Sequence, residues 1–171
     1  MSEKECRLIY REAFCDPDTE FENKLFRNCF KYCRTAEKDG KTAALLFALP
    51  CELYDGNEAE DAVYIYGAAT LKALRGRGYM TELINSLRRD GKTQFLVPAD
   101  EGLVPFYERC GFKKFTAFTF KKCEKYAAPI KEFIPLSVGE RANGEYGFTA
   151  MYRSDRARFL DGLYFPFSMI D

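Results

Sequence analysis

The stretch LRGRGYMTEL, residues 74–83, places Gly76 and Gly78 between two arginines at the start of a helical pattern. The preceding residues 63–71, VYIYGAATL, are rich in β-branched and aromatic side chains, which predicts a buried strand. The following residues 81–89 carry apolar side chains at spacings of three and four, which predicts one buried helix face. The predicted order is therefore strand, glycine turn, helix.

A turn of this composition can bind an anion. Glycines allow the backbone to approach a ligand closely, and the first N–H groups of a helix have no intrahelical acceptor. Together with the positive end of the helix dipole and the guanidinium groups of Arg75 and Arg77, these amides form a candidate site for a pyrophosphate. The alternative is a tight turn without a ligand.

Two other phosphate-binding motifs do not fit this stretch. A P-loop requires Gly-Lys-Ser/Thr after its second glycine, whereas Tyr79 and Met80 follow here. The dinucleotide fingerprint requires Gly or Ala where Thr81 stands, and a first glycine directly after the strand. Asp100 lies at a suitable distance for a ribose contact, but without the third glycine we do not interpret it as one.

The composition predicts one packed globular domain. The chain has 171 residues, of which 47% are hydrophobic and 16% aromatic. Lysine plus arginine and aspartate plus glutamate both total 26, so the long-range field that nucleic acid or an acidic membrane requires is absent. No apolar run reaches transmembrane length, and the first ten residues are too charged for a signal peptide. We therefore expect a soluble cytoplasmic protein that binds neither nucleic acid nor membrane.

The chain has no histidine and seven cysteines. The commonest general base and metal ligand is therefore missing, together with every Ser-His or Cys-His mechanism. The cysteine spacing does not resemble a zinc cluster, so we expect core thiols and no metal site. Acid–base chemistry must then use carboxylates, tyrosine, lysine, a thiol, a chain terminus or water.

Periodicity and turn residues predict the remaining elements. Residues 5–14 are predicted as the first strand, and the acid-rich residues 51–61 as a solvated loop. Asp39 and Gly40 separate two extendable runs, which predicts a hairpin. The other predicted elements are helices over 20–32 and 103–110, hairpin strands over 33–38 and 41–50, and strands over 93–99, 112–122 and 148–152. The apolar residues 163–167 are expected to pack on the domain. This order fits a mixed sheet with helices on both faces.

Two motifs resemble the GNAT superfamily, the Gcn5-related N-acetyltransferases. Residues 75–80, RGRGYM, are similar to the family's acetyl-CoA motif, Arg/Gln-x-x-Gly-x-Gly/Ala after a strand. Residues 106–112, FYERCGF, resemble the family's Phe-Tyr-Glu-x-x-Gly-Phe pattern at the end of a short helix. The resemblance covers roughly residues 5–122, and the two motifs together are more specific than either alone.

This resemblance implies a fold and a domain organisation. The implied class is α/β (α+β), with a mixed, mostly antiparallel central sheet flanked by helices and two splayed strands, as in GNAT-like acyl-CoA N-acyltransferases. The GNAT acetyltransferase domain would span residues 1–125, and residues 126–171 would be a C-terminal extension packed on the same domain. The splayed strands would be those that end near Thr70 and Ala99.

The resemblance also implies site residues, with acetyl-CoA as co-substrate. The strand before the motif would line the pantetheine arm, and the turn would bind the pyrophosphate. Tyr107 would be the general acid for the leaving CoA thiolate. The implied cofactor-binding residues are Ala68, Ala69 and Thr70 on the strand and Arg75, Gly76, Arg77, Gly78, Tyr79, Met80 and Thr81 in the turn and helix start.

The sequence departs from the family pattern at three positions. Met80 replaces the final Gly/Ala, which puts a bulkier neighbour beside the phosphate, and Lys72 stands where a proline is common. Asp100 stands where the family often has an asparagine, which puts one CoA contact in doubt.

The general base is left open by the sequence. No glutamate occurs within residues 63–71, so Glu52, Asp55, Tyr66 or a water molecule are the candidates. The RGRGYM form also resembles enhanced-intracellular-survival-type acetyltransferases, in which the C-terminal carboxylate acts as the base. That resemblance would assign the role to Asp171, although the larger part of that family's chain is absent here.

The expected function is acetyl-CoA-dependent N-acetyl transfer to a small-molecule or protein amine, by a monomer or homodimer. Acidic residues between positions 55 and 61 suit a cationic acceptor, and they equally suit a solvated loop. The alternatives are a catalytically silent acyl-CoA-binding module of the same fold and a dinucleotide-binding protein.

Overall fold

A computed structural model describes residues 1–15, 18–55, 58–115, 150–154 and 163–164. Short 3₁₀ turns over Phe30–Tyr32, Lys72–Leu74, Leu87–Asp90 and Glu101–Leu103 accompany the regular elements. These elements, in chain order, are α1 (Glu3–Phe14), α2 (Thr19–Cys29), β1 (Cys33–Lys38), β2 (Lys41–Asp55), β3 (Glu58–Thr70), α3 (Tyr79–Ser86), β4 (Thr93–Leu96), α4 (Val104–Arg109), β5 (Lys113–Phe115), β6 (Ala150–Arg153) and β7 (Leu163–Tyr164).

The strands form a mixed, mostly antiparallel sheet in the order β1-β2-β3-β4-β6-β5, and β7 pairs with β2. The pairs β1–β2, β2–β7, β4–β6 and β5–β6 are antiparallel, whereas β3 and β4 are parallel. The predicted fold class is therefore confirmed. The β3–β4 pairing ends at Tyr64 and Phe95, although β3 itself continues to Thr70. A pairing that ends this early is compatible with the predicted splay of the two strands.

The chain divides into two compact units, which we describe separately. The first unit comprises Met1–Leu49 and Ile65–Gly91. The second comprises Pro50–Tyr64 and Lys92–Asp171, of which only the ranges given above are described. The predicted boundary between residues 125 and 126 lies outside the described residues and stays a prediction.

The first unit opens with a helix where the sequence suggested a strand. The prediction of a strand over residues 5–14 is wrong, because these residues form α1. Its buried residues, Cys6, Ile9 and Tyr10, recur at helical spacing, whereas Leu8 is 56% exposed. The apolar residues at even positions had suggested an alternation of period two. The acidic first turn and Arg11 in the last turn also favour a helix.

The acid-rich segment is the second correction. Residues 51–61 were expected to form a loop, yet β2 continues to Asp55 and β3 begins at Glu58. Backbone pairing explains this difference, because Tyr54 and Asp55 pair with Tyr164 and Leu163 of β7. Hydrogen bonds in a ladder satisfy the backbone whatever the charge of the side chains.

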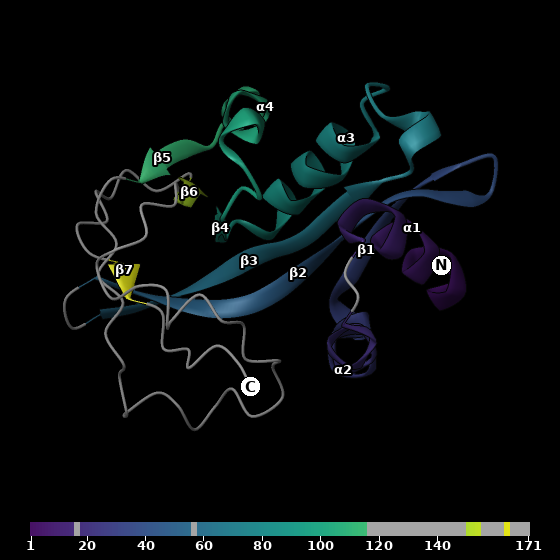
Figure 1. The fold of residues 1–171 in the computed structure, drawn as a ribbon. Helices are drawn as coiled ribbons and strands as arrows, with labels where there is room; N and C mark the ends of the chain where they lie inside the picture. The colour runs from purple at the N-terminus through teal and green to yellow at the C-terminus, as the bar shows by residue number, and fades with distance from the viewer. Residues whose placement is uncertain (16–17, 56–57, 116–149, 155–162, 165–171) are drawn as a thin grey trace. The chain divides into compact units, whose positions relative to one another are not determined.

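The β1–β2 hairpin is confirmed. Asp39 and Gly40 both have positive φ, 52° and 72°, as a two-residue type I′ connection requires. The helix after the glycine turn is also confirmed, and α3 buries Leu83 and Ile84. In Figure 1, α2 and α3 lie on opposite sides of the β2 and β3 ribbon within the first unit.

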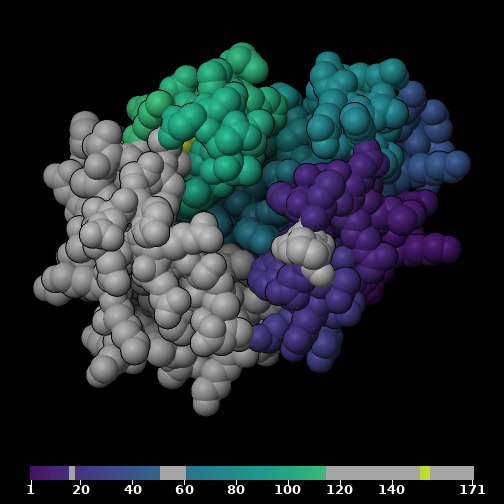
Figure 2. All heavy atoms as spheres, in the orientation of Figure 1, coloured from purple at the N-terminus to yellow at the C-terminus, as the bar shows by residue number. Residues whose placement is uncertain are grey.

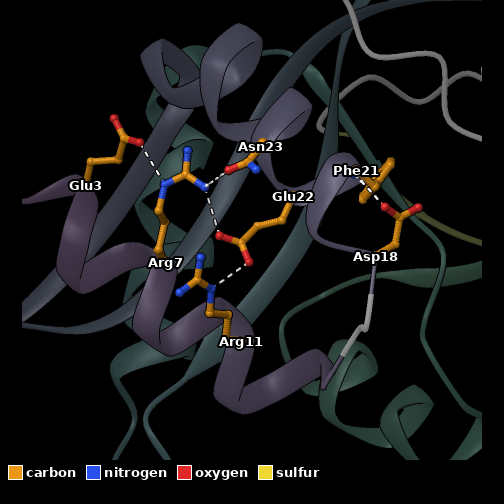
Figure 3. Close-up of polar contacts among 7 residues, drawn as sticks. All are labelled: Glu3, Arg7, Arg11, Asp18, Phe21, Glu22 and Asn23. Atoms are coloured by element: carbon orange, nitrogen blue, oxygen red, sulfur yellow. Dashed lines mark hydrogen bonds and ion pairs between the residues drawn. The ribbon is translucent and has the colours of Figure 1, made fainter.

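A buried carboxylate joins α1 to α2. Glu22 of α2 is only 5% exposed, and it accepts hydrogen bonds from Nη1 of Arg7 at 2.8 Å and from Nε of Arg11 at 2.7 Å (Figure 3). Arg7 also donates to Glu3 and Asn23, and its guanidinium lies 4.4 Å from the ring centroid of Phe26. We call Arg7, Arg11 and Glu22 the α1–α2 clamp.

The second unit packs around β4. All four residues of this strand are buried, and the ring of Phe95 lies 5.4 Å from that of Tyr64. Met151 of β6 and Tyr107 of α4 are buried in the same unit. The predicted strands over 93–99, 112–122 and 148–152 appear as β4, β5 and β6. β4 ends earlier than predicted, at Leu96, and β6 continues to Arg153, whereas residues 116–149 lie outside the described residues.

Candidate active site

The glycine turn has the backbone that its sequence suggests. Gly76 and Gly78 have φ of +74° and +87°, in the left-handed region. A Cβ atom at either position would find nothing within 4 Å. Glycine is therefore required here by backbone conformation, because a residue with a Cβ atom costs about 1–2 kcal/mol in this region.

Among the described residues, the first backbone donors of α3 have no hydrogen-bond acceptor. Gly78 is the N-cap residue and provides no side-chain acceptor, and the first recorded helical bond runs from Glu82 N–H to Gly78 O at 2.9 Å. The amides of Tyr79, Met80 and Thr81 thus precede the first residue that has an intrahelical acceptor. Arg75 and Arg77 are exposed beside them. Figure 2 shows the teal segment that leads into α3 at the surface of the molecule.

The turn is tied to the end of β3. Arg75 Nε donates to the carbonyl of Thr70 at 3.3 Å. The next two amides are also paired, from Leu71 to Ala43 O at 3.0 Å and from Lys72 to the Glu12 carboxylate at 2.8 Å. The first unit thus brings together all the predicted cofactor-binding residues, from Ala68 on the strand to Thr81 on the helix.

Gly67 was not identified as a site residue from the sequence. It has φ of +60° inside β3, directly before Ala68. A Cβ atom there would lie 3.2 Å from Phe47 Cδ2 and 3.3 Å from Tyr10 Cε2, so both conformation and space require glycine. A glycine within a strand pattern indicates a bulge or a close approach of another group, so the position of Gly67 in the sequence could have identified it.

The candidate bases have different places in the structure. Tyr66 lies on β3, with its hydroxyl 3.4 Å from that of Tyr10 and its ring 6.5 Å from that of Phe21. It therefore belongs to the first unit, on the same strand as Ala68. Glu52 and Asp55 belong to β2, and Asp171 lies outside the described residues.

Tyr107 lies on α4 in the second unit. Its side chain is 7% exposed and contacts the rings of Phe106 at 5.0 Å and Phe112 at 6.0 Å. Burial raises the pKa of Tyr107 to about 12, and Cys110 and Asp100 contribute in the same direction. The phenol therefore stays protonated at neutral pH and can act as a hydrogen-bond donor.

The two parts of the predicted site thus fall in different units. The turn belongs to the first and Tyr107 to the second. Each part is built by local sequence: the glycines shape the turn, while Pro105 lies in the first turn of α4 and Gly111, with φ of +87°, follows its end. The approach of the phenol to a bound thioester stays a prediction.

Most of the described cysteines are core thiols, as expected. Cys6, Cys29, Cys33 and Cys110 are buried, whereas Cys15 is exposed at the end of α1. Within the described ranges, no group of three or more Cys, Asp or Glu residues is arranged to hold a metal ion. In the same ranges, no helix combines the length and the apolar character that a membrane span requires.

The family model for the Acetyltransferase (GNAT) family matches residues 3–112. The chain belongs to this family. The match includes α1, α2, the glycine turn, α3 and α4, so both motifs lie within the GNAT region. No curated protein matches the chain in sequence.

Solved structures share the GNAT fold at low sequence identity. A probable N-acyltransferase from Enterococcus faecalis is 20% identical, with a TM-score of 0.54, over 64% of this chain and 29% of that chain. A GCN5-related N-acetyltransferase from Anabaena variabilis is 20% identical, with a TM-score of 0.56, over 66% of this chain and 30% of that chain. The Bacillus subtilis N-acetyltransferase YlbP, in complex with coenzyme A, is 11% identical, with a TM-score of 0.56, over 90% of this chain and 91% of that chain. The chain thus spans less than a third of the length of the first two.

Proposed function

We propose that this GNAT chain transfers an acetyl group from acetyl-CoA to a primary amine. The observation that carries the proposal is the uncapped N-terminus of α3 behind Gly76 and Gly78, inside the region that matches the family model. The coenzyme A complex of the B. subtilis YlbP protein, which shares the fold, supports the choice of co-substrate.

Binding would use the first unit. A diphosphate carries negative charge, and the amides of Tyr79, Met80 and Thr81 offer donors at the positive end of a helix. Arg75 and Arg77 are exposed and add two positive charges at the same turn. The pantetheine arm would run along Ala68–Thr70, where backbone groups can bond its amides.

The chemistry would be direct attack. The neutral amine nitrogen attacks the thioester carbonyl, a C–N bond forms, the C–S bond breaks and the thiolate leaves. Holding the two reactants together supplies much of the acceleration, because a thioester is already activated. The protonated phenol of Tyr107 would donate to the leaving sulfur. Tyr66, a carboxylate of β2 or a water molecule would take the proton from the amine.

The test replaces Tyr107 by Phe and measures release of free CoA thiol with a panel of polyamines, aminoglycosides, amino acids and peptides. Because a general acid contributes roughly 10²- to 10⁴-fold, we expect turnover to fall by about that factor with the affinity for CoA unchanged. Tyr64→Phe is the matched control, since it also removes a hydroxyl from a buried tyrosine of the second unit.

Two results would contradict the proposal. If the wild-type chain binds CoA but no amine releases thiol, it is the catalytically silent acyl-CoA-binding module. If NAD raises the melting temperature and CoA does not, the dinucleotide-binding alternative is favoured, because a ligand that binds only the native state stabilises it.

A further inference from the structure

A buried guanidinium lies at the centre of the second unit. Arg153 of β6 is 5% exposed, and its Nε donates to Oε1 of Gln94 on β4 at 2.9 Å. Its Nη2 donates to the same oxygen, and its Nη1 donates to the carbonyl of Cys110 at 2.6 Å. The guanidinium carbon lies 4.7 Å from the ring centroid of Phe112. One side chain therefore joins β4, the end of α4 and the residue before β5.

Burial of this charge needs a compensating environment. Removing an ion from water costs several kcal/mol even after relaxation, unless its hydrogen-bonding groups are satisfied. Here the carbonyl of Cys110 lies at the C-terminal end of α4, which is the negative end of a helix. The side-chain oxygen of Gln94 and the face of Phe112 also lie against the guanidinium group.

Cys110 and Phe112, which Arg153 contacts, belong to the short segment that follows Tyr107, and Phe112 also contacts Tyr107 directly. Phe112 N–H donates to the Tyr107 carbonyl at 3.0 Å, and the two rings meet edge to face at 6.0 Å. Cys110 N–H donates to the carbonyl of Phe106, the neighbour of Tyr107, at 3.2 Å. Gly111, with φ of +87°, lies between Cys110 and Phe112. The preceding helix, α4, has only six residues. A helix this short depends on tertiary contacts for its order.

We propose that Arg153, held by Gln94, is a positioning residue that fixes the end of α4 so that the Tyr107 phenol has one orientation. It acts through Cys110 and Phe112 and does not touch the substrate. This inference rests on the proposed function, because orientation matters most if the phenol serves the thioester. Lysine cannot replace arginine in this role, since a single ammonium group lacks the planar fork that bonds two acceptors at once.

The first experiment compares Arg153→Lys with Thr93→Val. Thr93 and Ser154 are the chain neighbours of Gln94 and Arg153, and Thr93 Oγ1 donates to Ser154 Oγ at 2.8 Å. The control therefore removes a part-buried hydrogen bond between β4 and the end of β6 but no bond to α4. We expect Arg153→Lys to lower kcat on the order of 10- to 100-fold, because small misplacements of a reacting group have effects of that size. The KM for acetyl-CoA should change less than twofold in both variants, and the kcat of Thr93→Val should stay near wild type.

The second experiment combines Arg153→Lys with Tyr107→Phe. If Arg153 acts through the phenol, its substitution should lower kcat no further once the phenol is gone. The inference would be overturned if the fold-reductions in kcat of the two single variants multiply in the double variant. It would also be overturned if Arg153→Lys and Thr93→Val lower kcat equally. Gln94→Met, which removes the acceptor of two of these hydrogen bonds, repeats both comparisons if Arg153→Lys fails to fold.

A readout independent of turnover separates this inference from the proposed function. In the full chain labelled with 3-fluorotyrosine, the ¹⁹F resonance that disappears in Tyr107→Phe reports the phenol. We expect one sharp resonance in the wild type and a broadened or split one in Arg153→Lys. An unchanged resonance overturns the positioning role. An unchanged kcat in Tyr107→Phe, with a resonance that does respond to Arg153→Lys, refutes only the catalytic role of Tyr107.

Discussion

At the residue scale, the glycines of the first unit have two different roles. Gly76 and Gly78 need the left-handed backbone but have open space around them, as befits positions that a ligand approaches. Gly67 needs the same backbone and has no space, because Phe47 and Tyr10 pack against it. Substitutions should therefore separate effects on binding from effects on folding.

Gly78→Ala should weaken CoA binding more than it destabilises the fold. The backbone strain costs about 1–2 kcal/mol of folding free energy. The added methyl group also occupies open space at the turn, where we propose that the diphosphate binds. Gly40→Ala is the matched control, since Gly40 has φ of +72° and nothing within 4 Å in the β1–β2 turn. Calorimetry should show CoA affinity reduced by about tenfold or more for Gly78→Ala alone; equal affinities in the two variants would contradict the assignment.

Gly67→Ala should destabilise the chain more than an open glycine does. Overpacking against Phe47 and Tyr10 adds roughly 1–3 kcal/mol to the backbone strain. Gly91→Ala is the control, because Gly91 has φ of +63° and nothing within 4 Å, so this substitution adds backbone strain without overpacking. Denaturant unfolding should give a larger loss for Gly67→Ala, and equal losses would show that the neighbouring rings move aside at no cost.

At the element scale, the α1–α2 clamp determines how the two N-terminal helices pack. Hydrogen bonds from Arg11 and then Arg7 hold the pKa of Glu22 below its ordinary value. A depressed carboxylate pKa stabilises the fold above the unfolded value of about 4.3, and this stability is lost as the pH falls through the lower folded value. The clamp should therefore make the first unit acid-sensitive below about pH 4.5.

Glu22→Gln should reduce the stability at pH 7 and flatten its dependence on pH. Breaking a buried ion pair costs about 3–5 kcal/mol. Arg11 is more than half exposed and can hydrate, so we expect about 1–2 kcal/mol here. Glu3→Gln, which removes only an exposed pair on α1, is the control. Urea unfolding between pH 3 and pH 7 measures both, and parallel pH profiles for wild type and Glu22→Gln would refute the role of the clamp.

At the scale of the whole molecule, local sequence predicted the conformation of the glycine turn better than it predicted the N-terminal fold. The glycine turn lies within ten consecutive residues, so its conformation depends on residues that are neighbours in the sequence. Residues 5–14 were misread because their apolar positions satisfy both a period of two and a helix face. The packing of Tyr10 against Gly67 and Phe26 decides between the two, and tertiary contacts of that kind cannot be read from the segment itself.

The support of Tyr107 could not be predicted either. Gln94 and Arg153 are separated by 59 positions, and the β4–β6 pairing brings them together. Nothing in the sequence indicates that this glutamine and this arginine form hydrogen bonds with each other. A buried charge becomes informative only once the fold shows that it is buried.

The most direct test follows the backbone amides of the turn by ¹H–¹⁵N NMR during titration with CoA, and with pantetheine as the control that lacks the diphosphate. We predict that the signals of Gly76, Gly78, Tyr79 and Met80 shift strongly with CoA and little with pantetheine. If CoA binds while these four signals stay in place, the diphosphate is bound elsewhere and the account of the site is wrong.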